Sequence, residues 1–267
     1  MKIEAKIIKD SISEAGDRLT TLELCYPRII HGEVMTHRVF SRNAMSSRAI
    51  PMKKVLAEVW NDPFVPMYFG KNQPGMQAKQ ELTGIKRWAA ETLWRQASKA
   101  ACIFAWGMNK VGLHKQIGNR ILEPFQWMRV ILTATEWDNF FSLRDHPDAE
   151  PHFQVLAKAI RQARGDSRPT LLRTGEWHLP YVAEGEGRWL PYMTPAKLSA
   201  ARCARVSYLT HDGRKPSNKE DLDLFERLAG SRPLHASPLE HQATPGAEDS
   251  GNFRGWTQYR KLWEKEV

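Results

Sequence analysis

The chain has 267 residues, of which 42% are hydrophobic and 26% are charged, the usual composition of a globular domain with a substantial core. Its three cysteines stand far apart without a C-x-x-C pair, which argues against a zinc ribbon or a disulfide framework and favours a reducing, cytoplasmic setting. No run reaches the length of about 20 apolar residues that spans a bilayer, and the first residues lack a signal-peptide core. The net charge of +9 favours an anionic partner, without choosing among nucleic acid, nucleotides and folate.

Two strands joined by a turn are predicted at the start of the chain. Residues 2–9 alternate apolar and polar side chains, and residues 18–30 carry Leu19, Leu22, Leu24 and Tyr26. The turn between them covers residues 10–16.

The next segment, residues 36–48, is named the basic motif. It holds three arginines, a histidine, an asparagine and three serines, with no acidic residue. Each of these side chains can donate hydrogen bonds to phosphate or carbonyl oxygens, so the segment indicates an anion-binding site. The simpler alternative is a solvated basic loop or a nucleic-acid patch.

An ordered loop is predicted over residues 60–77, which are rich in Pro, Gly and aromatic residues. A long helix follows, with apolar residues at 82, 85, 89, 93, 97, 100, 101, 104 and 108, and Gly112 should end it. We expect this apolar stripe to be core. A second helix, residues 113–122, should stop at Pro124 and carry Arg120 near its end.

Residues 129–144 start as a strand or a helix and end with Asn139 and Arg144. On its own pattern, Arg144 would be assigned to helix capping or to an ion pair with Asp145 or Asp148. An amphipathic helix is predicted over residues 151–164, with His152 in a packing role. Residues 165–193 form a loop-rich joint within a single domain of residues 1–267.

The last third should contain two helices and a second motif. Thr194 should cap a helix with Pro195 in its first turn, continuing through residues 200–204, and Ser217-x-x-Glu220 is a capping box that opens a helix to Ala229. The segment H-A-S-P-L-E-H, residues 235–241, lacks the H-E-x-x-H spacing of a metal site, so we expect no metal. No P-loop, Rossmann or G-x-S-x-G pattern occurs.

The order H-R-x-x-S-x-N-x-x-S-x-R in the basic motif resembles the R-H-R-x-x-S-x-N-E-x-S-x-R signature of flavin-dependent thymidylate synthases. Thr36 and Ala44 depart from it, where the family has an arginine and an acid, and receive no inherited role. Residues 119–124 and 139–144, and residues 204–208 followed by 235–241, also resemble blocks of this family. Because the last pair precedes the basic motif in the family, the chain resembles a circularly permuted and divergent, phage-type member.

The resemblance implies an α/β fold with a curved mixed sheet flanked by helices, and a homotetramer with shared active sites. It implies FAD as cofactor, with NADPH and methylenetetrahydrofolate as cosubstrates, and one-carbon transfer to C5 of a pyrimidine deoxynucleotide, with dUMP to dTMP favoured. The implied cofactor contacts are His37, Arg38, Asn43, Asn139, His235, Ser237 and Glu240. The implied substrate contacts are Ser46, Ser47, Arg48, Arg120 and Arg144, with catalytic roles for Arg144, Ser46 and Arg48. No cysteine nucleophile is required.

Two alternatives remain open. The same scaffold could hydroxymethylate dUMP or dCMP, if water rather than hydride traps the one-carbon adduct. From another class, a basic protein with ten tryptophans could bind nucleic acid without catalysis, although the resemblance makes this less favoured. The sequence leaves open the reductant, the source and the role of residues 245–267.

Overall fold

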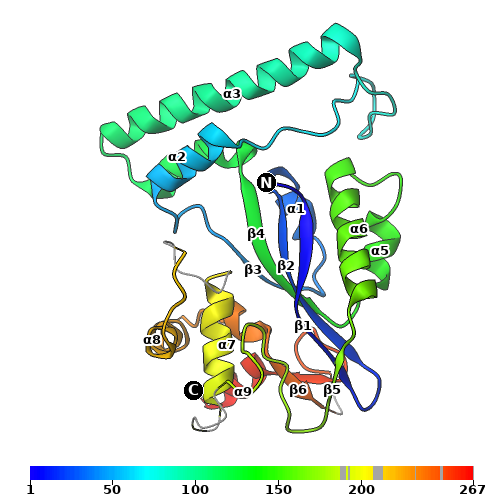
Figure 1. The fold of residues 1–267 in the computed structure, drawn as a ribbon, viewed down its shortest axis with the longest axis vertical. Coiled ribbons are helices and arrows are strands. Elements are labelled where there is room, and N and C mark those ends of the chain that lie inside the picture. Colours follow the sequence, from blue (N-terminus) through cyan, green and yellow to red (C-terminus); the bar gives the residue numbers. More distant parts are fainter. Residues whose placement is uncertain (187–190, 192, 207–212, 232, 247–248, 267) are drawn as a thin grey trace.

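A five-stranded mixed sheet lies at the centre of the computed structural model (Figure 1), which describes residues 1–266 apart from 187–190, 192, 207–212, 232 and 247–248. The strand order is β3-β4-β2-β1-β5, and every neighbouring pair is antiparallel except β1 and β5. The strands are β1 Glu4–Ser13, β2 Arg18–Pro27, β3 Ser41–Ala44, β4 Trp127–Ala134 and β5 Thr170–Leu172. The predicted pair of N-terminal strands is confirmed, and β1 is longer than expected because it runs to Ser13 before the turn. Strand β5 was missed, since it lies in the predicted loop-rich joint.

The two faces of the sheet differ in polarity. One face packs against α5 (Asp138–Arg144) and α6 (Pro151–Asp166) through a core that includes Leu22, Leu24, Val130, Leu132, Phe140, Phe153 and Leu156. The opposite face carries Thr21, Glu23 and Thr133, and it meets the C-terminal part of the chain. Helix α6 was predicted, and His152 packs as expected, with its Nε2 accepting from the Met67 backbone N–H at 2.9 Å.

The N-terminal turns and an upper helical layer complete the first part of the chain. After β2 come the 3₁₀ turn η1 (Arg28–Ile30) and the short helix α1 (His31–Val34). The upper layer consists of α2 (Met52–Asn61), α3 (Gly84–Lys110), α4 (Lys115–Gly118) and the 3₁₀ segment η2 (Asn119–Phe125). Helix α3 ends before Gly112, whose φ of 86° is a left-handed value that favours glycine. The helix expected at residues 113–122 is instead α4 followed by η2, which continues through Pro124; a 3₁₀ turn near its end tolerates the missing N–H.

Of the nine positions in the predicted apolar stripe of α3, Ala101 alone is buried within the single chain, so the prediction of a core stripe is wrong for the others. Ile85, Leu93 and Phe104 are 82%, 69% and 63% exposed. The packed face of the helix carries Ala101 together with Cys102 and Ala105, which contact the layer formed by α2 and η2. Periodicity correctly identified a helix, but α2 and η2 pack against a different side of it from the one that the apolar spacing indicated.

A C-terminal layer lies below the sheet in Figure 1. It contains α7 (Thr194–Ala204), α8 (Asn218–Ala229), the 3₁₀ turn η3 (Ser237–Glu240), α9 (Tyr259–Glu266), and the strand pair β6 (Ala243–Pro245) and β7 (Trp256–Gln258). The predicted capping box is present, because Ser217 and Glu220 exchange hydrogen bonds at the start of α8. Thr194 is not the cap of α7: Met193 holds that position, with a φ of 67°.

The two ends of the described chain lie in different parts of the molecule. Met1 lies near the upper half of Figure 1, whereas α9 lies at the bottom. Proximity of the ends therefore gives the suggested permutation no support, and it stays a prediction. No described helix combines the length and the apolar character needed to cross a membrane.

Candidate active site

Strand β3 divides the basic motif into two turns that point to different parts of the molecule. Arg42, on β3, donates from Nη1 to the carbonyl oxygens of Val34, Met35 and His37 at 3.3, 3.0 and 2.9 Å. These bonds fix the first turn, which carries His37 and Arg38. The Arg38 side chain is exposed.

His37 is buried among three phenylalanine rings and bound by an arginine. The ring centroids of Phe40, Phe140 and Phe153 lie 5.7, 5.1 and 5.9 Å from that of His37. The His37 Nε2 accepts a hydrogen bond from Nε of Arg144 at 2.9 Å. Burial, and then the charges of Arg144 and Arg42, lower the pKa of His37 to about 4. His37 is therefore neutral at pH 7, as an Nε2 acceptor must be.

Arg144 is held by three polar partners and one ring. Beyond His37, it donates from Nη1 to Oε2 of Glu33 and from Nη2 to Oγ1 of Thr36, both at 3.3 Å. Its guanidinium carbon lies 4.7 Å from the centroid of the Phe153 ring. Thr36, which had no predicted role, thus positions the arginine expected to act on the pyrimidine.

The alternative assignment for Arg144, an ion pair with an adjacent aspartate, is not what the structure shows. Asp145 accepts instead from Arg161 at 2.7 Å. Asp148 lies 3.8 Å from His146. The carboxylate that contacts Arg144 is Glu33, from a distant part of the sequence.

A pocket of about 500 Å³ opens beside His37. Asn139, on the exposed first turn of α5, lines the same pocket, so two predicted flavin contacts come together here. Other walls are formed by Trp137, Phe140, Arg18, Arg164 and Arg254. The volume falls within the usual range for small-molecule sites.

The three arginines of this pocket differ in their pairing. Arg18 forms an ion pair with Asp10 at 2.6 Å, and Arg254 forms one with Glu136 at 2.7 Å. Arg164 makes no salt bridge with any residue that the structure describes, and its guanidinium carbon lies 4.7 Å from the Trp137 ring centroid. Burial, followed by the charge of Arg18, lowers the pKa of Arg164 to about 10, so it remains charged at neutral pH. Sequence reasoning missed Arg164, which belongs to no motif.

A second group of predicted residues joins the basic motif to the C-terminal layer. The Asn43 side chain donates from Nδ2 to the Cys203 carbonyl at 2.8 Å and accepts at Oδ1 from the Ser237 hydroxyl at 3.0 Å. Two of the motifs quoted from the sequence, 194 positions apart, therefore meet directly. Glu240 accepts from Arg260 on α9. His235 is exposed and does not line the pocket beside His37.

Residues 252–258 form hydrogen bonds with β3 and the residue segment before it. They lie in the stretch to which the sequence assigned no role. Asn252 accepts at Oδ1 from the Ser41 hydroxyl at 3.0 Å and donates from Nδ2 to the Val39 carbonyl at 2.8 Å. Gln258 donates from Nε2 to Ser41 Oγ and to the Glu240 carbonyl, both at 3.2 Å. This part of the chain fixes the strand between the two turns of the basic motif.

The predicted phosphate contacts form a third group at the other end of β3. Ser47 is buried and donates to Oε1 of Glu123 at 2.6 Å, while Ser46 and Arg48 are exposed. Arg120 lies 3.7 Å from the same Glu123 carboxylate and is 52% exposed. None of these four predicted residues lines the pocket beside His37.

A buried chain of hydrogen bonds crosses the polar face of the sheet, and sequence reasoning did not anticipate it. It runs in the order Ser11, His178, Thr21, Thr133 and His241, with successive distances of 2.9, 2.8, 2.7 and 2.8 Å. Burial lowers the pKa of His241 to about 3 and holds that of His178 well below its usual value. Two neutral imidazoles thus tie the C-terminal layer to β1, β2 and β4.

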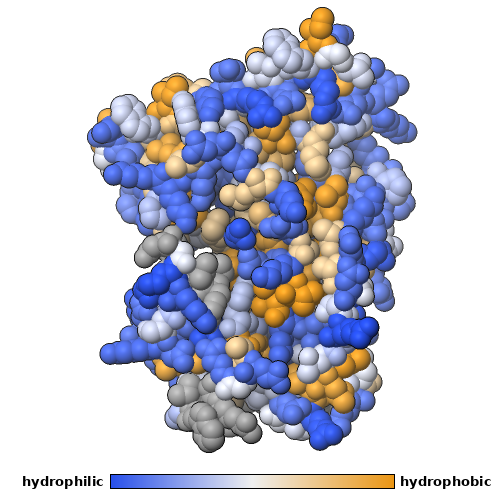
Figure 2. Space-filling view, in the orientation of Figure 1, coloured by the Kyte–Doolittle hydropathy of each residue, from blue (hydrophilic) through white to orange (hydrophobic). Residues whose placement is uncertain are grey.

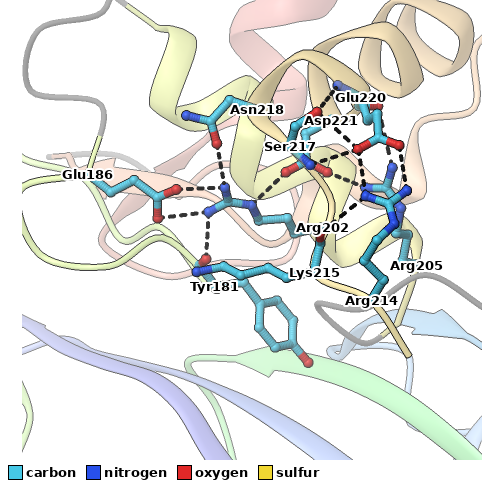
Figure 3. Close-up of polar contacts among 10 residues, drawn as sticks. All are labelled: Tyr181, Glu186, Arg202, Arg205, Arg214, Lys215, Ser217, Asn218, Glu220 and Asp221. Carbon is cyan, nitrogen blue, oxygen red and sulfur yellow. Dashed lines mark hydrogen bonds and ion pairs between the residues drawn. The ribbon is translucent and has the colours of Figure 1, made fainter. Parts of the chain in front are cut away.

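Figure 3 shows the polar cluster that joins α7 to α8. The guanidinium of Arg202, 1% exposed, donates hydrogen bonds to Asp221, Asn218, the Tyr181 carbonyl and both oxygens of Glu186. Arg205 also donates to Asp221. In the block of residues 204–208 that resembles the family, residues 204–206 thus lie beside an ion cluster. Residues 207 and 208 lie outside the described residues.

No protein-family model matches this sequence, and no curated protein matches it. Solved structures do match. The crystal structure of a UMP/dUMP methylase PolB from Streptomyces cacaoi bound with 5-Br dUMP is similar with a TM-score of 0.51 and 15% identity, over 61% of this chain and 90% of that chain. The structure of that methylase bound with 5-Br UMP gives a TM-score of 0.48 and 14% identity, over 61% and 89%. At 15% identity, the first match shows a shared fold.

Proposed function

We propose that this chain is a flavin- and folate-dependent enzyme that transfers one carbon to C5 of a pyrimidine deoxynucleotide, converting dUMP to dTMP. The observation that carries the proposal is the pocket shared by His37 and Asn139, with Arg144 bound to His37 at 2.9 Å. The likeness in fold to a UMP/dUMP methylase supports a pyrimidine nucleotide as the substrate.

The pocket suits a flat cofactor with hydrogen-bonding edges, as the isoalloxazine of FAD is. Trp137 and Phe140 provide an apolar wall, and the exposed Asn139 amide both donates and accepts. Arg164 provides a cation that has no salt bridge to a described residue. When bound, the flavin would supply the redox chemistry. The residues of the pocket would bind it, orient it and exclude water.

Arg144 would act on the nucleotide. Its guanidinium would stabilise the negative charge that develops on the pyrimidine as C5 attacks the one-carbon unit. The methylene group would come from methylenetetrahydrofolate, which leaves as tetrahydrofolate; C5 would lose its proton, and a hydride derived from NADPH would reduce the methylene group to methyl. Arg48 and Arg120 would hold the phosphate, together with Ser46 and Ser47.

The separation of these groups supports active sites shared between copies. Arg48 and Arg120 lie at the end of β3 away from the pocket that His37 and Asn139 line. Sites shared between copies would bring residues of both groups to one nucleotide. A homotetramer with shared sites is proposed on this basis, with Arg38, Asn43, His235, Ser237 and Glu240 as further flavin contacts.

A second product is compatible with one observation. Thr36 replaces the family's arginine, and its hydroxyl contacts Arg144 itself. A change beside the proposed charge stabiliser could favour water over hydride at the one-carbon adduct, which would give a 5-hydroxymethyl nucleotide from dUMP or dCMP.

The test combines an absorption spectrum with product analysis. The purified protein should bind FAD with a flavin absorption band, and with NADPH, methylenetetrahydrofolate and dUMP it should give dTMP by mass spectrometry. Parallel reactions with dCMP distinguish the second substrate, and the product mass distinguishes methyl from hydroxymethyl. A colourless protein that takes up no added FAD and instead retains oligonucleotides with a steep salt dependence would refute the proposal.

A further inference from the structure

Helix α3 has apolar residues on two opposite sides. Its inner side packs on the upper layer through Ala101, Cys102 and Ala105, all at most 7% exposed. Its outer side carries the outer stripe, defined here as Ile85, Ala89, Leu93, Ala100, Phe104 and Met108, at the spacing of one helical face.

The outer stripe lies open in the single chain. Ile85, Leu93 and Phe104 are 82%, 69% and 63% exposed, and the adjacent Trp88 and Trp106 are 68% and 56% exposed. Helix α3 is the outermost element of the upper layer in Figure 1, and separate apolar residues appear among hydrophilic ones along the same edge in Figure 2. Large exposed apolar residues gathered on one helix mark an interaction surface.

We propose that the outer stripe binds the same stripe of a second copy of this chain, with the two α3 helices antiparallel. The pattern is self-complementary about a twofold axis between Gln96 and Ala97. Around that axis, Phe104 of one copy lies level with Ala89 of the other, and Leu93 lies level with Ala100. In these two inner pairs each large side chain meets a small one, which lets the helices pack closely, while Ile85 lies level with Met108 at the ends of the stripe. A twofold interface requires this kind of match of a surface with itself.

The exposed area is sufficient for a stable pair. Buried aromatic side chains contribute about 150–250 Å² each. Trp88, Phe104 and Trp106, each more than half exposed, together with Ile85, Leu93 and Ile103, offer on the order of 600 Å² per copy, close to the approximately 800 Å² that one partner contributes to a standard interface.

A groove lies beside the outer stripe. It lies between α2 and α3, has a volume of about 520 Å³, and is lined by Leu56, Trp60, Ile103 and Trp106, among others. In the antiparallel pair this groove flanks the interface. The pairing does not depend on the proposed function, because none of these residues lines the pocket beside His37.

The first experiment measures mass by sedimentation equilibrium on the full chain, without nucleotide or flavin. The parent chain should associate at micromolar concentration, and Leu93→Glu and Phe104→Glu should each weaken association by at least tenfold. Leu171→Glu is the matched control, because it places a charge at a 55% exposed apolar residue on β5, 63 residues beyond Met108. Circular dichroism establishes that each variant is folded.

The second experiment tests the geometry and does not depend on charged variants. Under mild oxidation, Ala97→Cys should give a disulfide-linked dimer, because residue 97 lies next to the axis. Ala89→Cys should not, because its two copies would stand about 22 Å apart along the helices. The native cysteines are buried, and the parent chain controls for them. A monomeric parent chain, unchanged association of both glutamate variants, or equal cross-linking at 89 and 97 would overturn the proposal.

Discussion

Arg144 donates a hydrogen bond from Nε to Nε2 of His37 across 2.9 Å, although the residues are 107 positions apart. The bond needs an unprotonated Nε2, and the lowered pKa of His37, about 4, provides it at neutral pH. A neutral acceptor fixes the guanidinium without cancelling its charge. Thr36 is likewise a neutral partner, whereas the Glu33 carboxylate, at 3.3 Å, partly offsets the charge that Arg144 would present to a developing anion.

Removing Arg144 should damage chemistry more than nucleotide binding. An interaction made mainly in the transition state appears in kcat, and one such donor typically contributes about 10²–10³ in rate. Arg144→Lys should recover only part of the loss, because lysine cannot bond His37, Glu33 and Thr36 with a planar fork. The measurement is the single-turnover rate at saturating nucleotide with prereduced flavin. Arg161→Ala, which removes a nearby exposed arginine, is the control. A near-normal rate in Arg144→Ala with flavin still bound would place the charge stabiliser elsewhere.

Arg48→Ala and Arg120→Ala should instead weaken nucleotide binding. Both side chains are exposed, and Arg120 is only loosely paired with Glu123 at 3.7 Å, so their removal should leave the fold intact. A hydrogen bond to a charged group contributes about 1.5–3 kcal/mol, which corresponds to an increase in KM of roughly 10- to 100-fold. Steady-state kinetics would show KM rising with kcat nearly unchanged. Arg95→Ala, which removes an exposed arginine paired with Glu91 on α3, is the control, and an unchanged KM in both variants would remove Arg48 and Arg120 from the site.

Sequence patterns correctly predicted those helices and strands whose signals lie within a few adjacent residues. The alternation in residues 2–9, the capping box at Ser217 and Glu220, and the glycine that ends α3 each depend on a few adjacent residues. The outer stripe of α3 was misassigned because periodicity identifies an apolar face without identifying what covers it. The difference arises from long-range packing, which no short pattern encodes.

The candidate site divides in the same way. The family resemblance selected His37 and Asn139, and the fold brings both to one pocket. It did not predict that β3 would separate Arg48 from His37, since that separation depends on the pairing of β3 with β4. Arg164 had no sequence signal, because its environment is created by the packing of α6 against Trp137.

Replacing Cys25, Cys102 and Cys203 together by alanine should leave turnover per folded molecule largely intact. All three thiols are buried, and burial raises the pKa of each above its usual value, so none is a ready nucleophile at neutral pH. Some loss of stability is expected, because a buried cysteine packs as a small apolar side chain. Activity should be normalised to the folded fraction from circular dichroism. A folded but inactive triple variant would indicate thiolate chemistry.

Arg202→Met should destabilise the fold strongly. It removes one of the two arginines that pair with Asp221, whose carboxylate is 0% exposed and would keep its ion pair with Arg205. Breaking a buried pair on one side typically costs about 3–5 kcal/mol. Urea unfolding would measure the change, with Arg95→Ala, at an exposed pair, expected to cost less than about 1 kcal/mol. A loss as small as that of the control would show that the cluster in Figure 3 contributes little to stability.

The free energy of unfolding should fall as the solution is acidified, and the buried hydrogen-bonded chain should contribute to this fall. The pKa of His241 is about 3 in the folded state, whereas an unfolded histidine titrates near 6.5. Below pH 6.5 His241 binds a proton in the unfolded chain but not in the folded chain. The free energy of unfolding that this ring contributes above pH 6.5 is therefore lost progressively as the pH falls toward 3. For one such histidine the loss between pH 7 and pH 5 is about 2 kcal/mol.

His241→Asn should reduce the pH dependence of stability by roughly that amount, measured by urea unfolding at pH 7 and pH 5. The variant will also be less stable at pH 7, since it disturbs the bond to Thr133, but the pH dependence is the informative quantity. His235→Asn removes an exposed imidazole from the same motif and is the matched control. If both variants kept the pH dependence of the parent chain, the buried ring of His241 would have to accept its proton in the folded state. The hydrogen bond at Nδ1 of His241 would not prevent this protonation, because Thr133 Oγ1 can accept as well as donate. The neutral state assigned to His241 would then be wrong.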